Sequence, residues 1–428
     1  MGQENRIAIC DGVEAIHIQD KKYKSNFISV NFLVPLEEKT AAANALALQL
    51  LRRSCKEYPD FTSFNCRLSE LYGATVGGWV KKIGDVQALT LCIYSIRDEY
   101  ALTGEKISEE CAKLLLSMIF SPVLENGVFR TEDFEQEKRQ LLEEIQAEFN
   151  DKRVYAKKRC DSVMFEKEAF RLSPLGEKKD VEALTAEAAA RAWNSLLQSA
   201  KIEVMLLGDM EADAVIRQFA SSFQKVRKSA PPACRTMVRE SVGQVKEVVE
   251  RFDVSQAKLV MGFRTKIAEP SEKVMAMRLT SAVLGGTPHS KLFLNVREKL
   301  SLCYYCSSQY ERNKGVLYVS SGVEEKNKEA AQREILNQIN EIRRGHFDEE
   351  ELQAAKLSMQ DSFRTTSDSL VYLGDWYLRQ IFDHEVLSPE QAAAAVEKIG
   401  REEIIACAES LVLDTVYLLA GQEEEKKR

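Results

Sequence analysis

The sequence predicts an α+β protein built from two similar domains, each a mostly antiparallel sheet covered by helices. The first observation behind this prediction is an internal repeat: the apolar, strand-like stretch 26–34 is matched by 257–265, which lies 231 positions later. The second is that strand-like runs precede helix-like runs in each half, an order typical of helices packed on one face of a sheet. The third is the length of 428 residues, which suits two domains of about 200 residues better than a single core.

The remaining strands and the first helix of each half follow the same repeat. A glycine, Gly84 or Gly315, precedes the second matching strand in each half. A last apolar strand then closes each half on a glycine. The matching segments are 26–34 with 257–265, 40–51 with 271–282, 88–96 with 316–323, and 201–209 with 415–421.

Segments whose apolar residues recur with the helical period lie between these strands. Two later helices also begin with capping signals. Asp348 is followed by Glu351 at the third helical position, and Ser388 is followed by Pro389 and Gln391. Helices are expected at 107–120, 132–149, 185–197, 326–343 and 349–364, with a further one beginning after Ser388.

The boundary between the two halves is expected at a charged segment that contains the paired prolines Pro231 and Pro232. Proline and charge interrupt both the strand period and the helix period at this point. We therefore expect a first domain at 1–225, a linker at 226–245 and a second domain at 246–428.

Composition narrows the possible functions. The net charge of -7, with basic and acidic residues interleaved, gives no reason to expect a nucleic-acid partner. No stretch approaches about 18 uninterrupted apolar residues, so we expect no membrane partner. Ten cysteines are scattered along the chain, several inside apolar runs, which favours buried thiols and a cytoplasmic location over a disulfide framework.

The stretch 285–308 carries the most informative motif of the chain. It contains Gly285-Gly286 and then Arg297 and Tyr304, which are seven residues apart. This stretch resembles the substrate-contacting region in the second half of insulinase- and pitrilysin-like peptidases, the inverzincins. The resemblance covers essentially the whole chain and is strongest from 284 to 356. It implies a duplicated, clam-shell metallopeptidase-like fold.

The resemblance also implies roles for these residues. In active members of the family the matching arginine and tyrosine reach the substrate. A guanidinium offers a fork of donors to a peptide carbonyl or carboxylate, and a phenol can donate to an oxyanion. Taken singly, Arg297 reads as a surface charge and Tyr304 as a core aromatic. Ser301 and Cys303 depart from the family's usual Gly-Leu-Ala-Tyr.

Gly285 and Gly286 resemble a glycine-rich loop that touches substrate in non-catalytic subunits of mitochondrial processing peptidase. The other interpretation of two adjacent glycines is a tight turn. Both interpretations place the pair close to the Arg297 and Tyr304 motif along the chain.

The first half lacks the zinc-binding His-x-x-Glu-His motif of the family. Its three functional positions fall on Ala45, Leu48 and Gln49, and none of these side chains binds catalytic zinc or activates water. The chain has four histidines, at positions 17, 289, 346 and 384, so none lies between 18 and 288 and no two stand at helical spacing. We therefore expect no metal and no cofactor in this chain.

Glu137 and Glu144 are seven residues apart, so two helical turns bring them to one face. They resemble the paired glutamates downstream of the family's zinc helix, one of which is its third ligand. The alternative, favoured by the charged surroundings, is an ordinary solvent-facing helix surface.

Two hypotheses of function follow. In the first, the chain is a non-catalytic subunit that contributes Arg297 and Tyr304 to a composite peptide-binding site, while a homologous partner supplies zinc. This arrangement is similar to that of the bacterial paired peptidases and of the alpha subunit of mitochondrial processing peptidase. In the second, the chain is a proteolytically inactive peptide-binding or scaffold protein, which can form a homodimer. Neither hypothesis expects catalysis by the chain alone.

Overall fold

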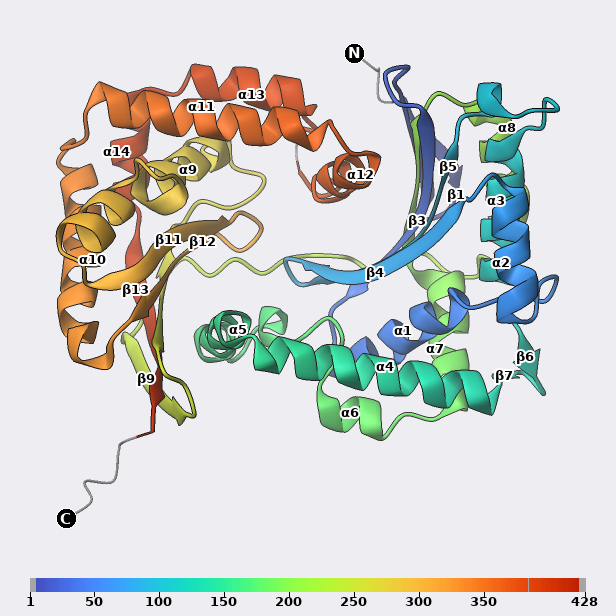
Figure 1. Ribbon diagram of the computed structural model, residues 1–428, viewed down its shortest axis with the longest axis horizontal. Coiled ribbons are helices and arrows are strands. Elements are labelled where there is room, and N and C mark those ends of the chain that lie inside the picture. Colours follow the sequence, from blue (N-terminus) through green and yellow to red (C-terminus); the bar gives the residue numbers. More distant parts are fainter. Residues whose placement is uncertain (1–4, 384, 423–428) are drawn as a thin grey trace. The chain divides into compact units, whose positions relative to one another are not determined.

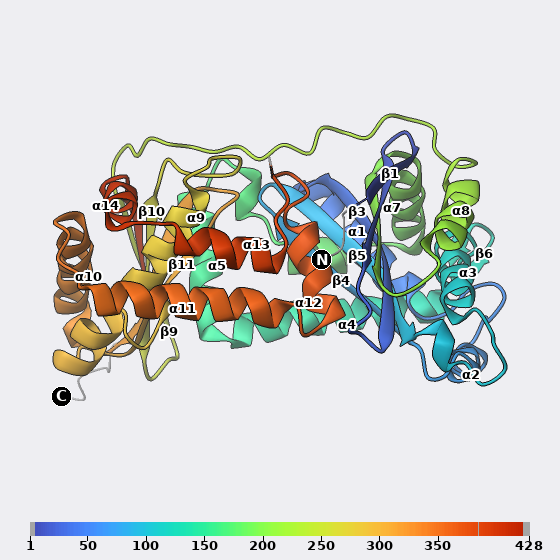
Figure 2. The same cartoon turned by 90° about the horizontal axis from the view of Figure 1, so that it is seen from above.

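The computed structural model describes residues 5–383 and 385–422, so His384 lies outside the described residues. The chain divides into two compact units. The first contains the chain up to Ala147 together with Leu172–Arg235, and the second contains Glu148–Arg171 together with the chain from Thr236 onward. Figures 1 and 2 show both units from two directions.

The first unit is organised around a six-stranded sheet. All neighbouring strands are antiparallel except β2 and β8, which are parallel. The long central strands β3 and β5 are almost fully buried, in keeping with their continuous apolar sequences. In spatial order the strands are β1 (Asn5–Cys10), β2 (Val13–Gln19), β8 (Lys201–Gly208), β3 (Ser25–Pro35), β5 (Val86–Ile96) and β4 (Thr75–Ile83).

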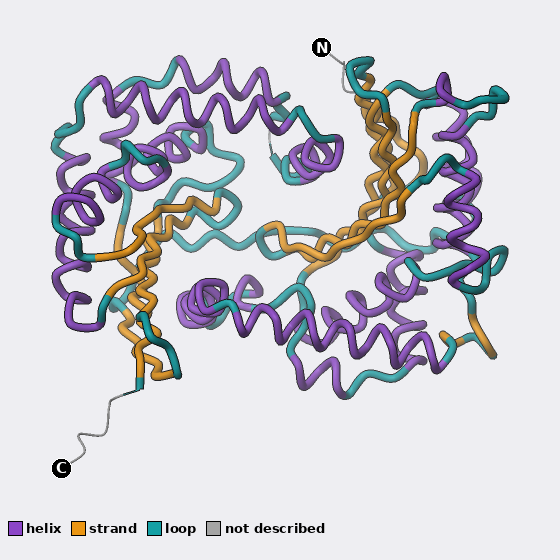
Figure 3. Tube along the Cα trace, viewed as in Figure 1, coloured by secondary structure: helices purple, strands orange, loops and turns teal. Residues whose placement is uncertain are grey.

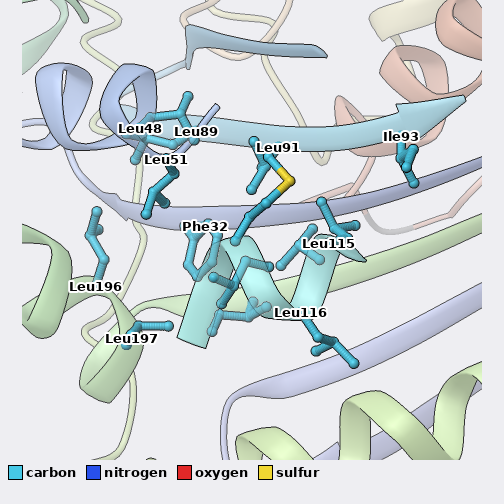
Figure 4. Close-up of a cluster of buried hydrophobic side chains, with 14 of the residues drawn as sticks. Phe32, Leu48, Leu51, Leu89, Leu91, Ile93, Leu115, Leu116, Leu196 and Leu197 are labelled. Carbon is cyan, nitrogen blue, oxygen red and sulfur yellow. The ribbon is translucent and has the colours of Figure 1, made fainter. Parts of the chain in front are cut away.

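Helices cover this sheet, and α3 and α8 lie side by side against it in Figure 1. The core between them is aliphatic and aromatic: Phe32 meets the ring of Trp193 edge-on, with centroids 5.0 Å apart, and leucines from α1, α3 and α7 surround it in Figure 4. The helices and short elements are α1 (Glu38–Leu51), α2 (Phe61–Glu70), η1 (Asp98–Tyr100), α3 (Ile107–Phe120), the hairpin β6 (Leu124–Glu125) and β7 (Val128–Phe129), α4 (Thr131–Asn150), α6 (Lys178–Glu182), α7 (Ala186–Ser199) and α8 (Ala212–Phe223).

The second unit repeats the strand order of the first. Its sheet runs β9-β13-β10-β12-β11, which matches β2-β8-β3-β5-β4, and the pair β9 and β13 is parallel as β2 and β8 are. The predicted duplication and the α+β class are therefore confirmed. The strands are β9 (Lys246–Phe252), β10 (Ala257–Arg264), β11 (Cys303–Glu311), β12 (Val316–Val323) and β13 (Val412–Gly421).

The helices of the second unit include the predicted segments and their caps. Asp348 and Ser388 each form a capping box with the residue three positions later, as the sequence predicts. Helices α11 and α13 run side by side in Figures 1 and 2, and Figure 3 separates the helical and strand regions by colour. The elements are α9 (Val274–Ser281), the π-helices η3 (Ala282–Gly286) and η4 (Leu292–Lys299), η5 (Glu325–Asn327), α10 (Lys328–Arg343), α11 (Glu349–Thr366), α12 (Leu370–Leu378), α13 (Pro389–Glu397) and α14 (Arg401–Glu409).

Helix α5 (Lys152–Met164) and the short turn η2 (Ala169–Arg171) also belong to the second unit, although the expected boundaries assigned them to the first domain. Helix α5 contacts β10 and β13. Gly262 on β10 permits this approach, because a Cβ at that position would lie 2.7 Å from the sulfur of Met164. A buried ion cluster adds to the contact: Glu168 accepts from Lys314 at 2.8 Å and from Arg264 at 3.3 Å.

Within the ranges that the structure describes, no helix is long and apolar enough to cross a membrane.

Candidate substrate-binding site

The Arg297 side chain leaves the π-helix η4, which Leu292 and Val296 anchor in the core. The helix ends where the Leu300 amide donates to the Asn295 carbonyl at 3.2 Å. The Arg297 guanidinium lies over the Phe293 ring, 4.5 Å from its centroid, and its Nε is 3.5 Å from the Glu298 carboxylate. The side chain is 41% exposed, so a ligand can reach it.

Tyr304 lies on β11 at a β-bulge. Cys303 pairs with Val323 and Tyr305 pairs with Gly322, so Tyr304 is the extra residue between two paired positions. Its side chain is 62% exposed, which excludes the core-aromatic interpretation. Within the described residues no hydrogen bond or ring contact joins Tyr304 to Arg297, so the two groups remain available to a ligand.

Ser301, between the two, explains one departure from the family pattern. Its backbone has φ of +50°, in the left-handed region where glycine is favoured. A serine therefore occupies a left-handed backbone position at the place where the family's pattern has glycine. Cys303 is buried beside Cys306, and hydrogen bonding to Cys306 and Ser321, together with the charge of Arg297, lowers the pKa of the Cys303 thiol.

Gly285 and Gly286 differ in what the structure requires of them. A Cβ on Gly285 would lie 2.7 Å from the backbone nitrogen of Ser308, so glycine lets η3 approach β11. A Cβ on Gly286 would have no contact shorter than 3.4 Å. The pair thus ends a π-helix against the strand that carries Tyr304, and only Gly285 is required by packing.

The positions that match the zinc motif lie on α1 and are closed to a metal. Ala45 and Leu48 are 0% and 1% exposed, and Leu48 packs beside Leu89 in the core shown in Figure 4. Gln49 offers an amide, which is not among the donors of catalytic zinc sites. These residues do not fit a zinc ion, and no cluster of metal-ligating side chains occurs elsewhere in the described part of the chain.

The structure brings Glu144 of α4 into contact with Gln49 of α1. The Gln49 amide donates to the Glu144 carboxylate at 3.1 Å, which joins a position expected from the zinc motif to one of the two expected relic carboxylates. Glu137 is 3% exposed and accepts from Arg53 at 2.7 Å, so it does not lie on a solvent-facing surface, whereas Glu144 is exposed. Arg53 also pairs with Asp133 at 3.0 Å.

Sequence reasoning missed Arg53. The only signal was a basic residue just beyond the expected helix, four positions after Gln49; the structure pairs it with Asp133 and Glu137 rather than with Glu144. A pocket of about 710 Å³ adjoins this network in the first unit. Arg53, Arg130, Asp133 and Glu137 line it together with Phe61, which is 76% exposed. Ion pairs hold these charges together: Arg53 pairs with Asp133 and Glu137, and Arg130 pairs with Asp133.

The fold and the site define a class of protein: a duplicated metallopeptidase fold with the residues for zinc replaced. The family described as "Peptidase M16 inactive domain" matches residues 183–359. The "Probable inactive metalloprotease YmfF" of Bacillus subtilis (strain 168) is 31% identical over 412 residues, which cover 96% of this chain and 96% of that protein. The chain belongs to the M16 peptidase family, and the resemblance to inverzincins is confirmed.

Solved structures agree on the fold. The crystal structure of a conserved protein from Enterococcus faecalis V583 matches with a TM-score of 0.90 and 27% identity, and the match covers 99% of this chain and 100% of that one. A peptidase M16 inactive domain from Pseudomonas fluorescens matches with a TM-score of 0.79 and 16% identity over 100% of both chains. The chain is therefore a homologue of inactive M16 peptidases that keeps the whole two-domain fold.

Proposed function

We propose that this chain is a non-catalytic subunit of an M16 peptidase and contributes Arg297 and Tyr304 to a composite site. A homologous partner with an intact His-x-x-Glu-His helix supplies the zinc, and a peptide is the substrate. The observation that carries the proposal is an asymmetry within one chain. The zinc positions are filled by core and amide side chains, whereas Arg297 and Tyr304 are exposed, and Arg297 meets only an exposed neighbouring carboxylate, Glu298, and the Phe293 ring among the described residues.

The chemistry of the two exposed groups supports this role. The planar guanidinium of Arg297 can donate two parallel hydrogen bonds to a peptide carbonyl or carboxylate. The Tyr304 hydroxyl can donate one hydrogen bond to the oxyanion that forms when a peptide bond is attacked. These two hydrogen bonds serve catalysis only if a second chain supplies the zinc and the activated water, because this chain has no group that activates water at the family's site.

The partner should form a stable heterodimer with an interface on the order of 1,200–2,000 Å² or more. The test is co-expression with each zinc-bearing homologue encoded in the same genome, followed by size-exclusion chromatography and cleavage of an unstructured peptide. We expect one homologue to co-elute with the chain and to cut the peptide only in the complex. We place this complex in the cytoplasm.

Variants of the complex test the two side chains. Tyr304→Phe should keep the fold and lower kcat/KM. The loss corresponds to roughly 2–4 kcal/mol of transition-state stabilisation, as for removal of other oxyanion donors. Arg297→Ala should also reduce activity. Tyr372→Phe, at a tyrosine that is 67% exposed on α12, is the matched control and should leave turnover unchanged. Equal turnover of the Tyr304→Phe and parent complexes would reject the role.

The co-expression experiment also tests the scaffold hypothesis. A chain that binds no zinc-bearing homologue, forms a stable symmetric dimer and captures peptides without cutting them is a binding protein, and the subunit proposal is then wrong.

A further inference from the structure

A second pocket lies in the second unit, between the start of α9 and the segment that follows α12. Its volume is about 450 Å³, within the range of small-molecule sites. One side is apolar, and two arginines, Arg278 of α9 and Arg312, also line the pocket. The apolar lining residues are Pro270, Val274, Met275, Trp376 and Leu387.

The Arg278 guanidinium has no acceptor. It lies over the Phe363 ring at 4.5 Å and 5.8 Å from the centroid of Trp376, but it forms no hydrogen bond or ion pair within 5–383 and 385–422. Burial lowers the pKa of this guanidinium to about 10. A guanidinium carries five N–H donors, and those of the half-buried Arg278 are open to water or to a ligand. The Phe363 and Trp376 rings contact the flat face of the Arg278 guanidinium, and the N–H donors at its edge have no protein acceptor among the described residues.

The nearby carboxylates are committed elsewhere. Arg312 binds both Glu269, at 2.8 Å, and Asp383. The indole N–H of Trp376 donates to the Leu387 carbonyl at 2.8 Å, so it does not need a ligand. The Arg278 donors are therefore available to an acceptor that enters the pocket from solution.

The start of α9 favours an anion at the same place. Val274, the first residue of α9, lines the pocket, and no side chain caps this end of the helix. The unpaired amides of a helix N-terminus attract negative charge. Because long side chains lean toward the N-terminus of their helix, Arg278 is directed back to this turn.

The opening of the pocket carries the opposite charge. Glu272 and Glu385 line it, both are exposed, and neither forms an ion pair in the described part of the chain. The lining thus offers an unused cation inside, an apolar wall, and unused carboxylates at the rim. A ligand that matches all three has a carboxylate, an apolar body and an ammonium group.

We propose that this pocket binds an apolar α-amino acid, either free or as a short peptide, with its carboxylate on Arg278. The apolar side chain lies against Trp376 and Leu387, and the ammonium group faces Glu272 and Glu385. The site belongs to this chain alone, so it does not depend on the proposed partner subunit.

Isothermal titration calorimetry of the purified full-length chain tests the proposal with L-leucine and with leucyl-leucine. We expect saturable binding of at least one, and the tighter of the two identifies the source of the ligand. L-Leucine methyl ester, which lacks the carboxylate, should bind at least about tenfold more weakly. 4-Methylpentanoate, which lacks the ammonium group, should also bind more weakly than L-leucine.

Arg278→Met retains an apolar stem over Phe363 and removes the donors, so it should weaken binding by about tenfold or more. Arg344→Met, at an arginine whose side chain is 65% exposed, is the control and should bind as the parent does. No saturable heat with either ligand at about 10 mM would overturn the proposal. Equal affinity for the ester and the free acid would do the same, and this comparison needs only the parent chain if Arg278→Met fails to fold.

Discussion

Glu203 offers a quantitative test of the structure of the first unit. Its side chain is 0% exposed on β8, directly opposite Glu14 in the parallel pairing with β2. The nearest cations, Lys201 at 3.5 Å and Arg6 at 3.7 Å from the Glu203 carboxylate, also reach Glu14. Burial therefore dominates and raises the pKa of Glu203 from 4.5 to about 7.

The sign of the effect on stability follows from linkage. The folded state binds the proton on Glu203 more tightly than the unfolded state does, so the stabilising contribution is complete below pH 4.5 and is lost as the pH rises through about 7. One pKa unit corresponds to about 1.4 kcal/mol, so the rise in the Glu203 pKa on folding corresponds to about 3 kcal/mol of folding free energy. Gln resembles the protonated carboxyl. Glu203→Gln should therefore equal the parent at low pH and exceed its stability by up to about 3 kcal/mol above pH 8.

The assay is urea unfolding at several pH values, followed by tryptophan fluorescence in a Trp376→Phe background. The remaining tryptophans, Trp79 and Trp193, then report the first unit alone. Glu182→Gln, at an exposed carboxylate at the end of α6, is the control and should change stability equally at every pH. A stability difference between Glu203→Gln and the parent that does not grow with pH would refute the reasoning.

Four further outcomes are expected. Gly285→Ala should lower the free energy of unfolding by about 1–3 kcal/mol because its Cβ meets the backbone of β11, whereas Gly286→Ala should cost less; equal costs in urea titrations would contradict the packing argument. Ser301→Gly should raise the Tm by relieving about 1 kcal/mol of left-handed strain, and a lower Tm would show that the serine is not strained. Glu168→Gln should cost about 3–5 kcal/mol, since it removes the buried carboxylate that Lys314 and Arg264 share and leaves Arg264 paired with Asp414, and a neutral result would rule out a stabilising cluster. The purified chain should hold no stoichiometric zinc by atomic emission; about one zinc per chain would contradict the conclusion that the first unit cannot bind catalytic zinc.

Much of the fold was predictable because its signals are local. The expected helix at 107–120 coincides with α3, and the capping residues Asp348 and Ser388 start α11 and α13 as predicted. The duplication was visible because corresponding strands kept their apolar character. These features depend on the period of the sequence and on short-range hydrogen bonds, both of which can be read along one segment.

The candidate site was less predictable because its decisive contacts are long-range. The pairing of Gln49 with Glu144 joins residues 95 positions apart, and nothing in either local sequence announces it. The π-helical geometry around Gly285 depends on the approach of β11. The exposure of Tyr304 depends on a bulge that only the pairing with β12 reveals. Local periodicity reports which face of an element is apolar, not what that face meets.

The membership of α5 in the second unit has a practical consequence for dissecting the protein. A polypeptide that starts at residue 236 lacks the helix that covers Val260, Tyr318 and Tyr417, and would present that apolar surface to solvent and to other copies of itself. It would also leave Lys314 and Arg264 without Glu168. Cleavage in the segment around 226–245 therefore does not yield two self-sufficient proteins. Fragment complementation of this half requires residues 148–171 to be supplied as a separate peptide or joined by a new connection.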